Sequence, residues 1–279
     1  MKTALLICLG AIAALWSTPS TNADSHLFEL RVYNAESGRQ ADVLKLIEGA
    51  GQKFMAAHHI ELVAAWVPTD SSDERVVTLV RHADRKACDA AWNEFQADPA
   101  WQTALKASEV NGKKPVKSFE RIFLSVNDYS PELSVESKGD RVFELRTYIA
   151  TPKNLAALNA RFRNHTVELF KKHGMTNIIY WSIADGEKLT AKSLLPSVSP
   201  VNKGAADISD DLPAAGNALV YFITHASEDA AKASFDSFRK DEVWNKVRTE
   251  SEKAAGGSLT VGNGVKSWFL KPTGFSPLK

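Results

Sequence analysis

The sequence predicts an α+β protein in which two tandem ferredoxin-like repeats (βαββαβ) pack as a pseudo-two-fold barrel. Three observations predict this fold. The hexapeptide FELRVY at residues 28–33 returns as FELRTY at residues 143–148, a second block of residues repeats at an offset of 143, and each copy carries strand and helix patterns in the order β-α-β-β-α-β. A sheet with helices on one face needs cover for its other face, and the second copy supplies that cover.

The duplication fixes the expected domain organisation. After a leader at residues 1–23, the first repeat spans residues 24–131, a linker spans 132–140, and the second repeat spans 141–279. The second repeat carries an insertion at about residues 185–217, rich in Ser, Pro, Gly, Ala and Asp, which predicts either a lid or a passive loop. The aligned pairs are Tyr33 with Tyr148, His58 with His173, Trp66 with Trp181, His82 with His225, and Trp101 with Trp244.

The elements of the first copy follow from residue patterns. Alternating polar and apolar residues predict strands at 28–33, 60–67 and 75–82, and a last strand near 119–125. Apolar residues at helical spacing predict a helix over 39–57, and Asp84 is the expected N-cap of a helix over 84–96. Asp98 followed by Pro99 predicts a further short helix, because proline suits the first helical position.

The N-terminus has the pattern of a secretory signal peptide. Lys2 precedes an apolar run over residues 4–16, and small and polar residues then lead to a plausible cleavage site before Asp24. The run is shorter than a membrane-spanning helix requires, which is about 20 residues. The sequence therefore predicts an exported protein, periplasmic or extracellular, without a transmembrane segment.

The charge and cysteine content bear on nucleic-acid binding and on disulfide formation. The chain has 34 Lys and Arg against 33 Asp and Glu, and the basic residues are scattered, which argues against a nucleic-acid partner. Cys8 lies in the leader, so Cys88 is the single cysteine that remains and no disulfide within the chain is expected.

The repeated hexapeptide suggests a site. On a strand, Glu29, Arg31 and Tyr33 share one face, as do their counterparts Glu144, Arg146 and Tyr148. If the apolar residues of these strands pack on the helices, the polar residues face the barrel interior. Two interpretations follow: an ion pair that joins the sheets, or a polar pocket in which arginine anchors a small ligand.

The second copy resembles the NIPSNAP family in FELRTY, RFRNHTVELFKKHGM, the tryptophan Trp181 and DEVW, and the first copy in FELRVY, Trp66, DPAW and DYSP. This resemblance covers nearly all of the chain after the leader. It implies a dimeric α+β barrel fold made within one chain, in a superfamily that includes small-molecule monooxygenases, isomerases and haem enzymes. It implies no particular reaction, because one fold supports many functions.

His165 is the candidate acid or base. It falls on the apolar stripe with Leu158, Phe162 and Leu169, where it is either a core histidine or a catalytic group, and it matches the family's helix histidine. The first copy has Ala50 there, so the second half is the expected location of any ligand site. Trp181 either belongs to the core or forms a wall near Arg146 and Tyr148.

Four further histidines have structural interpretations. His58 and His173 lie at helix ends, and His82 and His225 lie where a strand meets a helix start. No metal-ligand spacing and no nucleophile or phosphate-loop motif occurs, so no metal is assigned and the cofactor stays unknown.

Three functions remain open from the sequence. The leading hypothesis is a protein that binds a small, partly apolar molecule inside the barrel through Arg146, Tyr148 and Glu144. The alternatives are a cofactor-free oxygenase or isomerase acting on a phenol or enol, with His165 as base and Arg146 stabilising the enolate, and a non-catalytic scaffold or interaction module. Oligomerisation stays open.

Overall fold

The first half of the chain has the predicted order of elements. Strand β1 (Leu27–Ala35) leads into a helical segment made of α1 (Gln40–Leu46), the π-helix η1 (Ile47–Gly51) and α2 (Gln52–Ala57). There follow, in order, β2 (Glu61–Pro68), β3 (Val76–His82), α3 (Arg85–Ala97), α4 (Pro99–Ala107) and β4 (Val116–Val126). The computed structural model describes residues 26–184, 186 and 217–279. The expected leader at 1–23 and nearly all of the expected insertion at 185–217 lie outside the described residues.

The second half repeats this order. Its elements are β5 (Val142–Ala150), α5 (Leu155–Arg161), η2 (Phe162–Thr166), α6 (Val167–Lys172), β6 (Thr176–Ile183), β7 (Ala218–His225), α7 (Glu228–Lys240), α8 (Glu242–Ala254) and β8 (Thr260–Pro272). The π-helix occurs at the same place in both halves, which extends the internal repeat beyond the residues that match in sequence.

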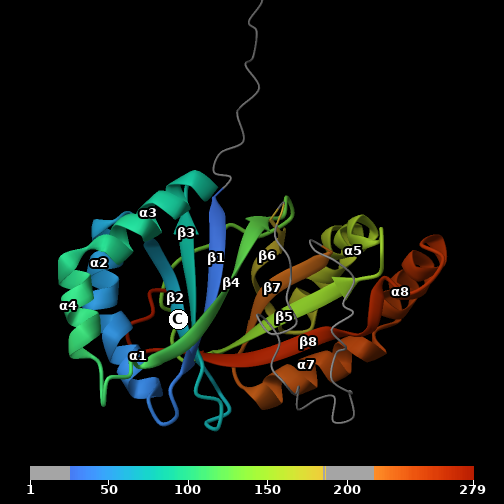
Figure 1. Ribbon diagram of the computed structural model, residues 1–279. Helices are drawn as coiled ribbons and strands as arrows, with labels where there is room; N and C mark the ends of the chain where they lie inside the picture. Colours follow the sequence, from blue (N-terminus) through green and yellow to red (C-terminus); the bar gives the residue numbers. More distant parts are fainter. Residues whose placement is uncertain (1–25, 185, 187–216) are drawn as a thin grey trace, which may run out of the picture.

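The strands of the two halves close into one barrel in the order β1-β3-β2-β8-β5-β7-β6-β4. Each half contributes a four-stranded antiparallel sheet, and the two sheets join at two seams, β2 with β8 and β4 with β6. Helices lie outside the barrel on opposite sides, one group for each half (Figure 1). This confirms the predicted fold of two ferredoxin-like repeats in a pseudo-two-fold α+β barrel, with the sheets joined edge to edge.

Aspartates cap the helices as the sequence predicts. The Asp84 side chain accepts a hydrogen bond from the backbone N–H of Ala87, and Asp98 accepts from those of Ala100 and Trp101. Asp241 caps α8 in the same way. These carboxylates satisfy N–H groups that have no partner within the helix.

The first helical segment of each half contains a π-helix, η1 or η2, and this changes which side chains of the segment are buried. The extra residue in the π-helical turn rotates the following part of the helix, so Thr166 and Gly51 are buried where constant helical spacing would bury His165 and Ala50. The expectation that His165 lies on the buried stripe is therefore wrong: His165 is exposed.

The predicted linker packs against the barrel. Leu133 and Val135 lie against the apolar cluster of the barrel interior, and the backbone N–H of Lys138 donates to the carbonyl of Lys279. The segment that joins the halves is thus held in place along part of its length. Among the described residues, no helix is both long and apolar enough to cross a membrane.

Candidate functional site between the helices and the sheet

The barrel interior is lined mainly by apolar side chains, in contrast to the expectation that the repeated Glu, Arg and Tyr would face it. Leu30, Val32 and Leu145 belong to the interior cluster together with Trp66 and Phe222. Because side chains alternate along a strand, the polar residues of β1 and β5 point outward, under the helices. The physical reason is that both faces of these strands are buried, so the alternating pattern divides the residues into two sets without saying which set faces the interior.

The first-half cluster is centred on the carboxylate of Glu29, which is fully buried. Its Oε1 accepts a hydrogen bond from Nε of Arg31 at 2.7 Å, and its Oε2 accepts one from Nε1 of Trp92 at 2.7 Å. The Nε2 atom of His82 lies 3.1 Å from Oε2. Burial alone would raise the pKa of Glu29, but the hydrogen bond with His82 and the charge of Arg31 outweigh it and lower that pKa to about 2. Glu29 is therefore ionised at neutral pH and is a weak base.

The second-half cluster has the same centre with different neighbours. Glu144 pairs with Nη1 of Arg146, accepts from the hydroxyl of Ser267 at 2.5 Å, and lies 2.8 Å from Nε2 of His225. Burial again opposes the charged form, while Arg146 and these hydrogen bonds hold the pKa of Glu144 at about 2. Both halves thus bury an ionised glutamate beneath their helices.

The two arginines differ in how many of their nitrogen atoms have partners. Arg146 donates to Tyr221 Oη through Nε at 3.0 Å and to Tyr148 Oη through Nη2 at 3.1 Å, in addition to its bond with Glu144. In the first half, Thr78 occupies the register position of Tyr221. Among the described residues, Arg31 donates to Glu29 alone.

A second arginine distinguishes the first half. Arg121 lies opposite Arg31 on β4, whereas Ser267 lies opposite Arg146 on β8. The Nη1 atom of Arg121 is 3.6 Å from Glu29 Oε1, and its side chain is 38% exposed. The first-half cluster therefore sets two arginines against one carboxylate, while in the second half one arginine balances one carboxylate.

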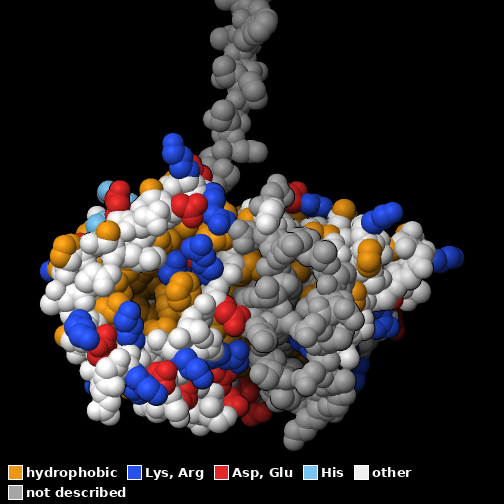
Figure 2. All heavy atoms as spheres, in the orientation of Figure 1, with side chains coloured by type: hydrophobic (Ala, Val, Ile, Leu, Met, Phe, Trp, Pro, Cys, Tyr) orange, Lys and Arg blue, Asp and Glu red, His pale blue; other side chains and the backbone are white. Residues whose placement is uncertain are grey.

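Apolar rings accompany these arginines. The guanidinium carbon of Arg31 lies 3.4 Å from the ring centre of Trp92 and 5.1 Å from that of Phe119. Phe119 is 47% exposed and packs near Tyr33, with ring centres 6.0 Å apart. Figure 2 shows a hollow on this side of the molecule, between the first-half helices and strands β1 and β4, with hydrophobic side chains inside and Lys or Arg side chains at its edge. The first half thus combines an open apolar surface with excess positive charge.

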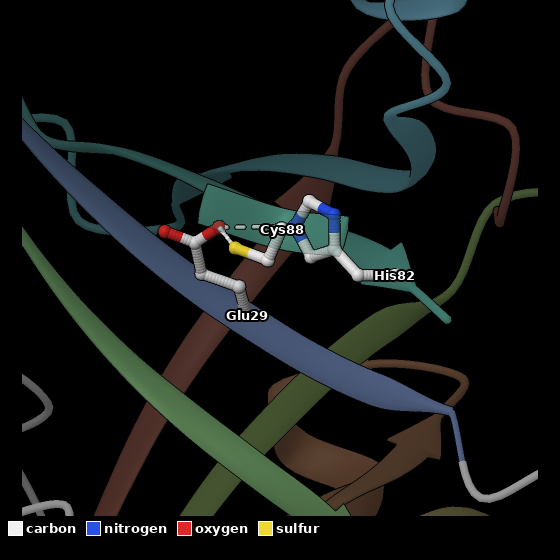
Figure 3. Close-up of side chains that lie close together, drawn as sticks. All are labelled: Glu29, His82 and Cys88. Carbon is white, nitrogen blue, oxygen red and sulfur yellow. Dashed lines mark hydrogen bonds and ion pairs between the residues drawn. The ribbon is translucent and has the colours of Figure 1, made fainter. Parts of the chain in front are cut away.

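Within residues 26–184, 186 and 217–279, Glu29, His82 and Cys88 form one group of side chains whose spacing could hold a metal ion, with ligand atoms within 4.8 Å of one another (Figure 3). Zinc accepts this donor set. However, both oxygens of Glu29 already accept hydrogen bonds, and Arg31 supplies the balancing positive charge. Burial and the charge of Glu29 also raise the pKa of Cys88 to about 12, which opposes the thiolate that metal binding needs. The charges therefore fit an ion pair better than a metal centre.

The predicted site residues separate into distinct environments. Glu144, Arg146 and Tyr148 are connected by hydrogen bonds, as are Glu29 and Arg31. Trp181 lies in the barrel interior, on the opposite face of the sheet from Arg146, so it forms no wall beside that residue. His165 lies exposed on η2 and does not join either glutamate cluster.

The sequence did not assign His82, His225 or Cys88 to these clusters, nor Trp92, Arg121, Tyr221 and Ser267. His82 and His225 were expected to be structural groups at strand ends, but each lies beside a buried glutamate. Their recurrence at an offset of 143 was the available signal. Cys88 has Ala231 at the corresponding position of the second half and carried no signal. His58 and His173 do lie at helix ends, where they contact the capping residues Asp98 and Asp241.

Comparisons with known proteins agree with this fold. Residues 28–131 match the model of the family described as NIPSNAP. A search of the curated proteins gave no match. A structure of an anthrone oxidase-like protein is 14% identical, with a TM-score of 0.52, over 90% of this chain and 92% of its own. A putative monooxygenase from Lactobacillus acidophilus is 11% identical, with a TM-score of 0.50, over 89% and 94%.

A NIPSNAP family protein from Agrobacterium tumefaciens is 22% identical, with a TM-score of 0.33, and the match covers 38% of this chain and 97% of that protein. At identities of 11–14%, the two structures that match nearly the full chain support the fold, but they do not indicate which reaction, if any, this protein catalyses. The family match lies on the half that contains Glu29, Arg31 and Arg121. Residues 28–131, the first half of the chain, therefore form a NIPSNAP domain.

Proposed function

We propose that the first half binds a small, partly apolar anion in the hollow between its helices and its sheet. The observation that carries this proposal is the unequal use of the two equivalent arginines. Arg146 is bonded through all three nitrogen atoms, whereas Arg31 is bonded to Glu29 alone among the described residues, although its side chain is only 5% exposed. A buried guanidinium with donors to spare favours a carboxylate, sulfonate or phenolate partner.

The charge of the cluster supports an anion rather than a neutral ligand. Arg121 adds a second positive charge 3.6 Å from Glu29, so one carboxylate faces two guanidinium groups. Phe119 and Tyr33 add ring surface beside these charges. An aromatic ring that carries one acidic group matches both properties, because ligand sites combine apolar surface with a few placed polar groups. This proposal places the ligand outside the barrel and in the first half.

A cofactor-free oxygenase or isomerase is the second candidate. Two guanidinium groups would stabilise the phenolate or enolate that such a reaction forms, by electrostatic preorganisation. The likeness in fold to a protein described as anthrone oxidase-like is consistent with this candidate and supplies no residue for it. His165 is exposed on η2 in the second half, outside both glutamate clusters. This candidate therefore rests on the first-half arginines.

Export remains part of the proposal. The apolar run at residues 4–16 and the small residues before Asp24 support cleavage of a signal peptide. Sequencing the N-terminus of protein recovered from an expressing bacterium tests it: a mature chain that begins near residue 24 is expected, and an uncleaved Met1 in the cytoplasmic fraction would contradict it.

The binding proposal is tested by calorimetric titration with 2-naphthoate and with 2-naphthamide, which has the same ring system without the charge. The naphthoate is expected to bind more tightly. Arg121→Ser introduces the residue that the second half carries, and it is expected to weaken naphthoate binding by about tenfold, the scale of one charge-assisted hydrogen bond. Arg163→Ser is the matched control, because Arg163 has a similar exposure of 41%. Equal binding of the two ligands, or equal loss in both variants, would favour the scaffold alternative.

A further inference from the structure

A second pair of arginines lies in the second half, where the first half has two leucines. Arg161 is the last residue of α5, and Leu46 is the last residue of α1. Arg248 stands seven residues after the capping residue of α8, as Leu105 does in α4. The repeat therefore identifies two positions at which apolar residues in one copy are arginines in the other.

Arg161 is buried, and its charge is poorly compensated. Its side chain is 5% exposed, and its Nε and Nη1 atoms are buried without a hydrogen-bond partner. Glu252 Oε1 lies 3.6 Å from Nη1, an ion-pair distance that is too long for a hydrogen bond. The Trp244 ring centre is 5.2 Å from the guanidinium carbon. Buried donors without partners cost free energy, so this arrangement needs an explanation.

The surroundings of Arg161 add positive charge. Trp244, Arg248 and Glu252 are spaced four residues apart, so they share the face of α8 that lies next to α5. Because Trp244 and Glu252 both contact Arg161, Arg248, which lies between them on this face, also faces α5. Burial lowers the pKa of Arg161, Tyr148 and Glu252 oppose this, and Arg248 adds to the lowering. Glu252, itself 34% exposed, is the carboxylate that faces Arg161.

We infer that the α5–α8 face of the second half binds an oxyanion, a phosphate or carboxylate group, between Arg161 and Arg248. Such an anion accepts hydrogen bonds from both guanidinium groups and offsets the repulsion between them. Arg248 is exposed and forms the solvent side of this site. In Figure 1, α5 and α8 lie next to each other at the outer end of the second half, away from the first-half helices. The site is therefore separate from the first-half hollow.

Titration calorimetry with inorganic phosphate and with malonate, at constant ionic strength, tests this inference on the full chain. The wild type is expected to bind at least one of the two, and the one that it prefers identifies the group as phosphate or carboxylate. Arg161→Leu introduces the first-half residue and is expected to weaken that binding by about tenfold or more. Arg163→Leu removes one charge from the neighbouring η2 and is expected to leave the binding constant unchanged.

Arg248→Leu provides a second variant at an exposed position, where loss of folding is not expected. It should weaken binding in the same direction as Arg161→Leu. Arg121→Ser, which tests the first-half hollow, should leave phosphate and malonate binding unchanged, so the two proposals can fail independently. Absence of binding to the wild type, or binding that Arg161→Leu and Arg248→Leu leave intact, would overturn the inference.

Discussion

Arg31 and Arg146 occupy equivalent positions on β1 and β5, but Arg146 donates to three oxygen atoms and Arg31 donates to one. One of these acceptors, Tyr221, is replaced by Thr78 in the first half. Another, Tyr148, has the counterpart Tyr33, which accepts no hydrogen bond from Arg31 among the described residues. The duplicated fold has thus kept one ion pair in two forms. In the second half tyrosine hydroxyls accept from the other guanidinium nitrogens, and in the first half Arg31 makes no such bonds among the described residues.

This relationship predicts unequal costs for removing the two arginines. Arg146→Met leaves the carboxylate of Glu144 buried without its cation and is expected to cost about 3–5 kcal/mol of unfolding free energy. Arg31→Met is expected to cost less, because Arg121 remains 3.6 Å from Glu29. Urea denaturation of both variants measures the difference. A greater loss of unfolding free energy for Arg31→Met would show that the Arg146 hydrogen bonds contribute less to stability than those of Arg31.

The two buried glutamates predict loss of stability in acid. The pKa values of Glu29 and Glu144 are about 2, below the usual 4.5, so their stabilisation is present above pH 4.5 and is lost as the pH falls toward 2. Each contributes on the order of 3 kcal/mol at neutral pH by proton linkage. Unfolding free energies measured between pH 6 and pH 3 are expected to fall less steeply in Glu29→Gln and Glu144→Gln than in the wild type. The exposed Glu61→Gln is the control, and the same slope in all variants would contradict the assignment.

Burial predicts an unreactive thiol at Cys88. Its pKa is raised to about 12, first by burial and then by the charge of Glu29, so the reactive thiolate is scarce at pH 8. Iodoacetamide is expected to label the peptide that contains Cys88 only after unfolding in guanidinium chloride. Mass spectrometry of the digested protein gives the labelled fraction, and rapid labelling of the native protein would show that the cluster opens to solvent.

The sequence predicted the order of elements, the caps and the repeat, because these depend on local patterns and on matching residues. It did not predict which face of β1 looks inward, because Leu30 and Glu29 are both buried and alternation alone is symmetric between the faces. It placed His165 on the buried stripe because constant helical spacing does not anticipate a π-helix. Cys88 and His82 meet Glu29 from separate elements, a juxtaposition that one sequence does not reveal.

The π-helix predicts that His165 has little effect on stability. His165→Ala is expected to change the unfolding free energy by no more than about 0.5 kcal/mol, as for an exposed residue. Phe162, at the start of the same π-helix, packs against the rings of Tyr148 and Phe170. Phe162→Ala is therefore expected to cost about 3–5 kcal/mol. Thermal and urea unfolding of both variants provide the test. A large loss of unfolding free energy for His165→Ala would indicate that His165 is buried in the core.

Phe222 predicts how the two halves unfold. This second-half residue lies in the barrel interior, with its ring centre 4.7 Å from that of Trp66 in the first half and 6.0 Å from that of Trp181. Because one apolar cluster contains side chains from both halves, neither half buries its inner sheet face alone. The protein is expected to unfold in a single transition. Phe222→Ala is expected to lower its unfolding free energy by about 3–5 kcal/mol through a cavity in this cluster.

Tryptophan fluorescence and far-ultraviolet circular dichroism, followed in the same urea series, distinguish one transition from two. Coincident curves in the wild type and in Phe222→Ala are expected, because the cavity weakens the shared core without giving either half a core of its own. Phe119→Ala is the control for removing a ring, since Phe119 is 47% exposed and lies outside the barrel. Two separate transitions in the wild type would mean that each repeat is stable by itself, and that the barrel forms by docking of two folded domains.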